Sequence, residues 1–349
     1  MRMISIACIL VLAGTGLALV AGFLGRLHPL FDSFSHFRVH LVVLALVAAL
    51  PLFVSNWKVG VPVLLAAALA AATTTAAVPV PIVGVKVGAF APRVLDQPVY
   101  RLLQANLRYD NPTPEAFLSL VGRAKPDVIT LNEVSRPWRD KLQVLQAAYP
   151  YSRFCEPARG VWAVAILSRR PFAGGEDIRC DRRGAFADAA FDFGGRTVWI
   201  AAMHLGWPWP FGQDRQLRQL EPRLAALGET ALLAGDMNAT PWSRTVTDVA
   251  RAGGFDLMPS PGPTWVSGRL PIGLIPFGLP IDQVFAKGGV RVHAVTRAEP
   301  VGSDHLPLLV DFSVAPQARP PADEPEIDVV TDQRLRVSDE TRRSTLPPG

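Results

Sequence analysis

The N-terminal run of residues 3–25 constrains this chain most, because it is apolar and contains no charged side chain. A helix of that length can cross the hydrocarbon core of a bilayer. Two more apolar runs follow, at residues 39–56 and 61–85. Backbone polar groups inside a bilayer must be satisfied within the segment. We therefore expect residues 1–98 to be a membrane region with about three transmembrane helices, and the protein to be a multi-pass protein of the cell's inner (plasma) membrane.

A cleaved signal peptide is the alternative for the first run, since Arg2 precedes it directly. The two later runs favour membrane spans over this alternative. The sequence does not settle which membrane face carries the rest of the chain. Basic residues in the short loops favour a cytoplasmic C-terminal domain, whereas pairing of Cys155 with Cys180 would indicate an oxidising compartment.

Charge is concentrated in the membrane region. The chain has a net charge of +5, and residues 1–98 contribute six basic and two acidic side chains, or +4 of that total. The remainder is nearly neutral, so the basic balance is weak support for a nucleic-acid-binding surface.

Residues 99–313 alternate short apolar runs typical of strands with helical patterns such as Asp214–Gly228, where leucines recur on one face. This alternation predicts an α/β domain with a large core. Residues 314–349 are rich in Pro, Asp, Glu and Arg and lack an apolar pattern. We expect them to form a disordered tail.

Polar residues stand at the ends of the predicted strands, where a rigid scaffold can gather side chains into one site. They are Asn106 in QAN, Glu133 in LNE, His204 in AAMH, Asp236 and Asn238 in GDMN, Asp282 in PID, and Asp304 with His305 in SDH. Each motif alone is weak, and only the joint order is specific.

The residue types in this set fit phosphoester hydrolysis. Carboxylate and amide oxygens of Glu133, Asp304 and Asn106 suit Mg²⁺ (or Mn²⁺). Asp and His side chains then remain for proton transfer and for stabilising charge on phosphorus-bound oxygens. A cation, a base and hydrogen-bond donors are what such a reaction requires.

In this order, the motifs resemble those of the endonuclease/exonuclease/phosphatase superfamily. That group includes exonuclease III-like AP endonucleases, DNase I, neutral sphingomyelinases and inositol polyphosphate 5-phosphatases. The resemblance covers about residues 99–313, and its sharpest parts are GDMN and GSDHLPL. It implies a four-layer β-sandwich, in which helices flank two packed mixed β-sheets.

The resemblance also implies roles. Glu133 would be the principal metal ligand beside Asn106, with Asp304 as a second carboxylate on the metal side. Because family members often have His or Tyr after the aspartate of the ID motif, Gln283 is a departure from the pattern.

The remaining residues would act on the ester. Asp236 would activate the attacking water, Asn238 would position it or contact phosphate, and His204 would contact the scissile phosphate. His305, oriented by Asp282, would stabilise charge on the phosphoryl group. Whether Asp236 or His305 is the general base stays open.

The substrate is less constrained. Trp207 and Trp209 lie in a rigid loop after His204, and an apolar Gly/Pro-rich loop at residues 268–280 precedes Asp282. These loops could face a membrane, stack on nucleic-acid bases, or pack on the protein itself.

The function expected from the sequence is therefore a membrane-anchored, metal-dependent phosphodiesterase of endonuclease type. A phospholipase C-like enzyme or phosphoinositide phosphatase acting on lipid headgroups is one alternative, and a non-catalytic membrane protein that keeps the fold is another. The expected partners are a phosphoester substrate (nucleic acid or lipid headgroup) and the bilayer, and no protein partner is predicted.

Overall fold

The computed structural model describes residues 2–55, 57–75, 87–155, 163–175 and 177–315. The predicted tail lies outside these residues from residue 316 onward, and the last strand extends to Val314, one residue into the segment predicted as tail.

The N-terminal part is helical. It comprises α1 (Arg2–Phe23), α2 (Pro29–Ser35), α3 (Arg38–Ser55) and α4 (Trp57–Thr75). Across the described residues, only α1 is by itself long and apolar enough to cross a membrane, over Ser5–Phe23. The helices α2 and α3 together could form a second span, bent by 61° at their junction.

The expectation of about three transmembrane helices in a multi-pass protein is therefore not supported. The second apolar run is preceded by a bend between α2 and α3. The third run is seen only as far as Thr75, where α4 ends, and residues 76–86 lie outside the described part of the chain.

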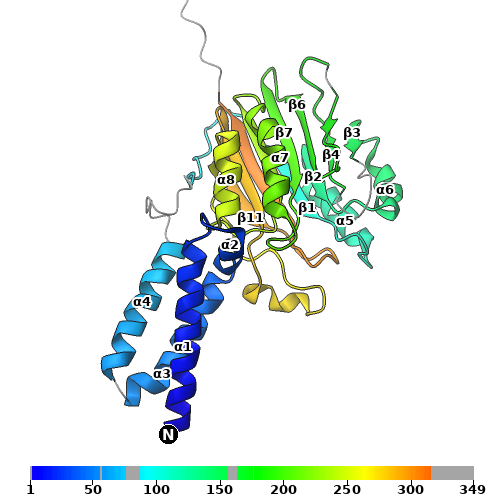
Figure 1. The fold of residues 1–349 in the computed structure, drawn as a ribbon. Helices are drawn as coiled ribbons and strands as arrows, with labels where there is room; N and C mark the ends of the chain where they lie inside the picture. Colours follow the sequence, from blue (N-terminus) through cyan, green and yellow to red (C-terminus); the bar gives the residue numbers. More distant parts are fainter. Residues whose placement is uncertain (1, 56, 76–86, 156–162, 176, 316–349) are drawn as a thin grey trace, which may run out of the picture. The chain divides into compact units, whose positions relative to one another are not determined.

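The described chain after the N-terminal helices is built around two six-stranded sheets (Figure 1). The first has the order β11 (Val290–Arg297), β12 (Leu308–Val314), β1 (Tyr100–Asn106), β2 (Val128–Asn132), β4 (Ala165–Ser168) and β3 (Tyr151–Phe154). The second has the order β5 (Arg179–Cys180), β6 (Phe186–Asp192), β7 (Thr197–His204), β8 (Ala231–Asp236), β10 (Asp282–Lys287) and β9 (Asp256–Leu257). Both sheets are mixed, since β1–β2 and β7–β8 are parallel and the other pairs are antiparallel.

The central strands of each sheet are buried on both faces, in keeping with their near-continuous apolar sequences. In β1, Leu102 packs between the sheets, whereas Leu103 faces the outer core under α5 (Pro114–Ala124) and α6 (Arg136–Leu142). In β8, Leu232 and Leu233 divide in the same way, with Leu233 in the core under α7 (Gln213–Ala225) and α8 (Arg244–Gly253). Figure 1 shows α7 and α8 side by side over their sheet. The predicted α/β sandwich of two mixed sheets flanked by helices is confirmed.

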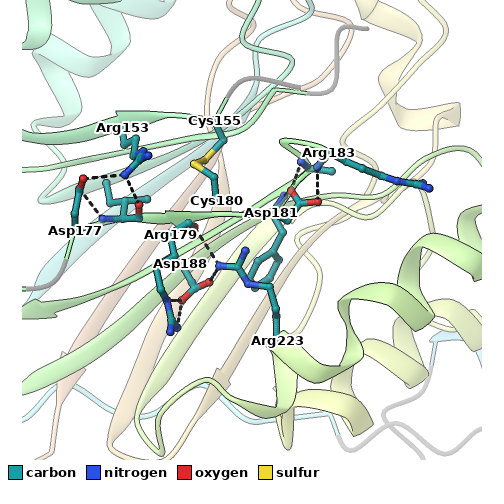
Figure 2. Close-up of a disulfide and its surroundings, with 12 residues drawn as sticks. Arg153, Cys155, Asp177, Arg179, Cys180, Asp181, Arg183, Asp188 and Arg223 are labelled. Carbon is teal, nitrogen blue, oxygen red and sulfur yellow. Dashed lines mark hydrogen bonds and ion pairs between the residues drawn. A yellow bond between two sulfur atoms is a disulfide. The ribbon is translucent and has the colours of Figure 1, made fainter. Parts of the chain in front are cut away.

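Cys155 and Cys180 form a disulfide with a Cα–Cα distance of 5.5 Å (Figure 2). Cys155 directly follows β3 and Cys180 lies in β5, which are edge strands of the two different sheets. The disulfide therefore joins the two sheets at one edge of the sandwich. It resolves the pairing that the sequence leaves open.

Candidate active site

Strand register brings three of the predicted residues into one row. His204 at the end of β7 lies opposite Asp236 at the end of β8, and Asp236 lies opposite Asp282 at the start of β10. A parallel pair and an antiparallel pair thus deliver three polar side chains to the same edge of the second sheet. All three are buried.

A matching row ends the first sheet, where Asn106 of β1 lies opposite Asn132 of β2. The two rows are hydrogen-bonded to each other. The Asn106 amide donates to Asp236 Oδ2 at 3.0 Å, and the backbone N–H of Asp236 donates to Asn132 Oδ1 at 3.0 Å. Buried polar groups of the two sheets therefore satisfy one another across the sandwich.

Asp236 is the centre of this arrangement. Its Oδ2 lies 3.6 Å from His204 Nε2 and 3.6 Å from His305 Nε2, and its Oδ1 accepts the backbone N–H of Asn238 at 2.8 Å. Burial raises the pKa of Asp236 to about 7, against the lowering effect of His305. A carboxylate with such a pKa can accept a proton near neutral pH.

Asp282 lies beside His305, with its Oδ2 2.8 Å from His305 Nδ1. Burial alone would lower the pKa of His305, but the carboxylates of Asp282 and Asp236 outweigh it and raise that pKa to about 10. The imidazole therefore holds its proton at neutral pH and can donate from Nε2. Asp282 is itself held by the Gln104 amide at 3.0 Å and by its own backbone N–H, which donates to Thr264 Oγ1.

His204 is different in charge. Burial and the nearby His305 lower its pKa to about 3, so it is neutral at physiological pH. Its backbone carbonyl accepts a hydrogen bond from the Gln216 side chain of α7 at 2.9 Å, which fixes the strand end.

Glu133 lies on the side of Asn106 and is less buried than Asp236. The Asn106 amide donates to Glu133 Oε1 at 3.1 Å, so one amide bridges Glu133 and Asp236. Glu133 has a φ of +57°, in the left-handed region that a glutamate adopts at an energetic cost. Such strain is common where a fold must aim a functional side chain.

Asn106 has its NH₂ group toward the two carboxylates, and its oxygen accepts the backbone N–H of Arg108 at 2.9 Å. The predicted role of this oxygen as a metal ligand therefore requires the amide to flip. Asn and Gln oxygens and nitrogens are assigned from their hydrogen bonds, and those bonds change when a cation binds.

Asp304 is placed by its neighbours in the SDH motif. Its Oδ2 accepts the indole N–H of Trp265 at 3.1 Å, and Ser303 Oγ donates to the Asn106 carbonyl at 2.8 Å. The Asp304 segment is thus fastened to the strand that carries Asn106. The Trp265 ring also lies 6.4 Å from the His305 ring, between the site and the loops that follow.

The donor set fits a divalent cation. Asp236, Asp282 and His305 each place one ligand atom within 4.8 Å of the others. Glu133 and Asp304 are not part of that compact group. The site holds more carboxylates than the one protonated His305 balances, and hard oxygen donors are those that Mg²⁺ prefers. The Asp282–His305 hydrogen bond occupies the imidazole Nδ1. The carboxylate of Glu133, beside the bridging Asn106 amide and less buried than Asp236, is therefore a better-placed oxygen donor for the cation.

The other predicted residues surround this cluster. Asn238 has a φ of +44°, and its amide donates to the Leu205 carbonyl at 2.8 Å. Gln283, the departure from the family pattern, donates to the carbonyls of Ala239 and Pro280 and so supports the GDMN loop. Trp207 and Trp209 are partly exposed, and the Trp207 ring lies 5.6 Å from Trp265.

Four residues of the site are not predicted as site residues from the sequence: Gln104, Asn132, Thr264 and Trp265. Gln104 and Asn132 are polar residues in otherwise apolar strands, and this interruption is the sequence signal that could identify them as site residues. Thr264 and Trp265 lie in a loop without a motif, and their role depends on contacts that only the fold defines.

Comparison with known proteins agrees with this geometry. The family model described as "Endonuclease/Exonuclease/phosphatase family" matches residues 103–305, more than half of the chain. None of the curated proteins matches the chain.

Several solved structures are similar to this chain. Zebrafish (D. rerio) TDP2, in a structure titled as a complex with single-strand DNA product, has a TM-score of 0.50 and 18% identity; the match covers 62% of this chain and 99% of that one. The human nocturnin catalytic domain has a TM-score of 0.49 and 18% identity, with 65% and 97% covered. Sphingomyelinase C from Streptomyces griseocarneus has a TM-score of 0.44 and 18% identity, with 61% and 99% covered.

At 18% identity, the TDP2 structure shows a common fold and nothing finer. The matched residues 103–305 begin within β1 and end at His305, so they contain every residue of the two facing rows. The chain belongs to the endonuclease/exonuclease/phosphatase family of metal-dependent phosphoester hydrolases.

Proposed function

We propose that this protein hydrolyses a phosphoester by attack of water on phosphorus, and that helix α1 holds it at a membrane. The observation that carries the catalytic part is the position of Asp236, whose carboxylate is within 3.6 Å of groups from three other chain segments. Burying an ionised carboxylate destabilises the fold unless hydrogen bonds or an opposite charge compensate it, so such a group is typical of a functional site.

Glu133, with Asn106 in its flipped rotamer, would hold a divalent cation, Mg²⁺ or Mn²⁺. When bound, the cation supplies positive charge to the phosphoryl oxygens. Asp304 adds a carboxylate at the border of this group.

Asp236 serves as the general base in this proposal. It accepts the proton of the attacking water, because a pKa near 7 leaves roughly half of the carboxylate ionised at neutral pH and makes that form a stronger base than an ordinary aspartate. His305 does not compete for this role, since it already holds a proton. Its Nε2–H instead donates to a phosphoryl oxygen, and Asp282 keeps the ring oriented and charged.

Asn238 and His204 complete the site. Asn238 positions the water, since its backbone N–H is fixed on the same Asp236 carboxylate that takes the proton. His204, neutral and buried beside Asp236, contacts the ester as an uncharged hydrogen-bonding group.

Membrane attachment is supported by the surface of α1. Its large apolar side chains, including Leu10, Leu17 and Val20, are exposed in the described structure. Contiguous exposed apolar surface of this kind marks a membrane or protein contact. Two contacts oppose cleavage of α1 as a signal peptide: the buried Arg38 donates to the Gly22 carbonyl at 3.0 Å, and its guanidinium lies 4.0 Å from the Phe23 ring centroid.

The disulfide supports an assignment of the membrane face. Disulfides persist in oxidising compartments and are rare in the cytosol. We therefore place the sandwich on the extracytoplasmic side, against the count of basic loop residues.

The test uses the full chain in detergent micelles or nanodiscs. Bis-p-nitrophenyl phosphate should be hydrolysed in the presence of Mg²⁺ or Mn²⁺ and not after chelation. Failure of both metals to support turnover of this ester, of single-stranded DNA and of phospholipid would contradict the proposal.

A further inference from the structure

The connection between α1 and α3 is bonded to the sandwich at several points. Asp32 of α2 is buried and accepts the backbone N–H groups of Arg244 and Thr245 at 2.7 and 3.0 Å. It thereby satisfies free amides in the first turn of α8. The Trp242 indole donates to the Ser35 carbonyl at 2.6 Å.

Two loops beside the active site touch the same connection. The Trp209 ring lies 6.2 Å from the ring of His28, which precedes α2, and His40 Nε2 lies 2.8 Å from the carbonyl oxygen of Phe277. Phe277 ends the short 3₁₀-helix η2 (Ile272–Phe277), and His40 lies in the first turn of α3. One loop therefore meets the helical part just before α2, and the other meets it in the first turn of α3.

These loops carry a cluster of exposed apolar side chains, which we call the rim. Its members are Trp207, Trp209, Phe211, Leu270, Leu274 and Phe277. Phe211 and Phe277 are 76% and 74% exposed. Apolar groups gathered in two neighbouring loops are unlike the single exposed residues that ordinary surfaces carry, and tryptophan is the residue that favours a bilayer–water interface.

The rim continues the apolar outer surface of the helices. Val39 and Val43, on either side of His40 in α3, are exposed, as are Leu17 and Val20 near the end of α1. The hydrogen bond between His40 and Phe277 thus joins the rim to the level at which these apolar helix surfaces end. On its other side the rim reaches the site, through the contact of Trp207 with Trp265 and the bond of Trp265 to Asp304.

We propose that the rim docks on the lipid bilayer that holds α1, so that the site acts on phosphoesters of lipid headgroups in that bilayer. The substrate part of this inference rests on the proposed hydrolase activity, whereas the docking part does not. We favour a bilayer because the rim is continuous with the apolar outer surface of α1 and α3, which is itself suited to a bilayer. Stacking of the rim on nucleic-acid bases would not account for this continuity.

The docking test places a fluorescent reporter on the rim. In the full chain reconstituted into phosphatidylcholine vesicles, the tryptophan added by Phe277→Trp should be quenched by brominated phosphatidylcholine. The matched control is Val144→Trp, at an exposed apolar position in the 3₁₀-helix η1 (Gln143–Leu145) under the other sheet. Equal quenching of the two added reporters would overturn the docking.

The substrate test compares three esters. Phe211→Ser with Phe277→Ser should lower headgroup release from vesicles of phosphatidylcholine and phosphatidylglycerol at least tenfold, while turnover of bis-p-nitrophenyl phosphate stays unchanged; Val144→Ser should change neither. An equal fall for both esters would mean that the rim only stabilises the fold, and this outcome would overturn the inference. Cleavage of a single-stranded oligonucleotide without headgroup release would overturn the lipid substrate while leaving the hydrolase proposal intact. If the unmodified protein hydrolysed none of the three esters, the proposed hydrolase activity would be contradicted. The fluorescence experiment would still decide whether the rim docks on the bilayer.

Discussion

Asn106 and Asp236 end strands of different sheets and are joined by a hydrogen bond of 3.0 Å. The bond crosses the sandwich at its functional edge. The relative placement of the two sheets therefore sets the geometry of the site, and a shift between them would separate the amide from the carboxylate. On the other side of the same amide lies Glu133, so a single side chain couples the proposed base to the proposed metal ligand.

Replacing Asp236 with Asn should lower the rate by about 10²–10⁴-fold, the usual contribution of a general base. The amide keeps the size of the side chain, so the sandwich should stay folded. The measurement is ester turnover together with circular dichroism. Asp140→Asn, at an exposed position of α6, is the matched control and should leave the rate unchanged. An Asp236→Asn enzyme of normal activity would remove Asp236 from the mechanism.

Asp282→Asn should move the alkaline limb of the pH–rate profile to lower pH. The Asp282 carboxylate helps to raise the pKa of His305. Without it the imidazole loses its proton at a lower pH, and the donor to the phosphoryl oxygen is lost there. A purely structural role for Asp282 would lower the rate at every pH and leave the limb in place.

Chelation by EDTA should abolish activity, and Mg²⁺ or Mn²⁺ should restore it. Glu133→Gln should raise the metal concentration needed for half-maximal activity, because a neutral amide is a weaker ligand than a carboxylate. Glu115→Gln, which changes an exposed carboxylate paired with Lys141, is the control. A metal requirement that is identical in all three proteins would place the cation elsewhere.

Gly235→Ala should destabilise the second sheet. A Cβ at this position would lie 1.9 Å from the Met203 carbonyl oxygen in the neighbouring strand. Such overpacking commonly costs about 1–3 kcal/mol, and more where backbone must move. Gly122→Ala, in α5 with open space around it, should instead stabilise the protein by about 0.5–1 kcal/mol. Thermal unfolding of the two variants provides the comparison.

The disulfide gives a prediction about compartment and stability. In protein isolated from membranes without reductant, Cys155 and Cys180 should resist alkylation until they are reduced. Replacing both with serine should lower the free energy of unfolding by about 2–4 kcal/mol. Free thiols at both positions in freshly isolated membranes would contradict the extracytoplasmic placement.

The strand-end motifs are predictable from the sequence because each adjoins an apolar run that has the length of a buried strand. The structure corrects their order in part: the motifs up to Asp236 follow their strands, whereas Asp282 starts β10 and the SDH motif precedes β12. Asp282 and His305 lie side by side. The helix over Pro114–Ala124 also follows from local signals, since Thr113 and Pro114 mark its start.

Other features depend on long-range pairing. The strand Val290–Arg297 has no continuous apolar run in the sequence, because polar and charged residues interrupt it. Its pairing with β12 also contains a register shift between Val292 and Ala294. Gln104 appears in the sequence only as an interruption of an apolar run, yet it bonds to Asp282, 178 residues further along. The predicted number of membrane spans is not supported for another reason. Among the described helices only α1 is by itself long and apolar enough to cross a membrane, and the third apolar run is described only as far as Thr75.

Asp32 has a consequence for how this protein must be handled. Its carboxylate closes the first turn of α8, and α8 covers the sheet that carries Asp236. A fragment that begins at β1 would lack Asp32 and Ser35. The backbone amides of Arg244 and Thr245 and the indole of Trp242 would then lose these hydrogen-bond acceptors. The helical N-terminal part is thus an integral part of the enzyme's architecture, and exchanging it for unrelated helices would alter the catalytic half as well.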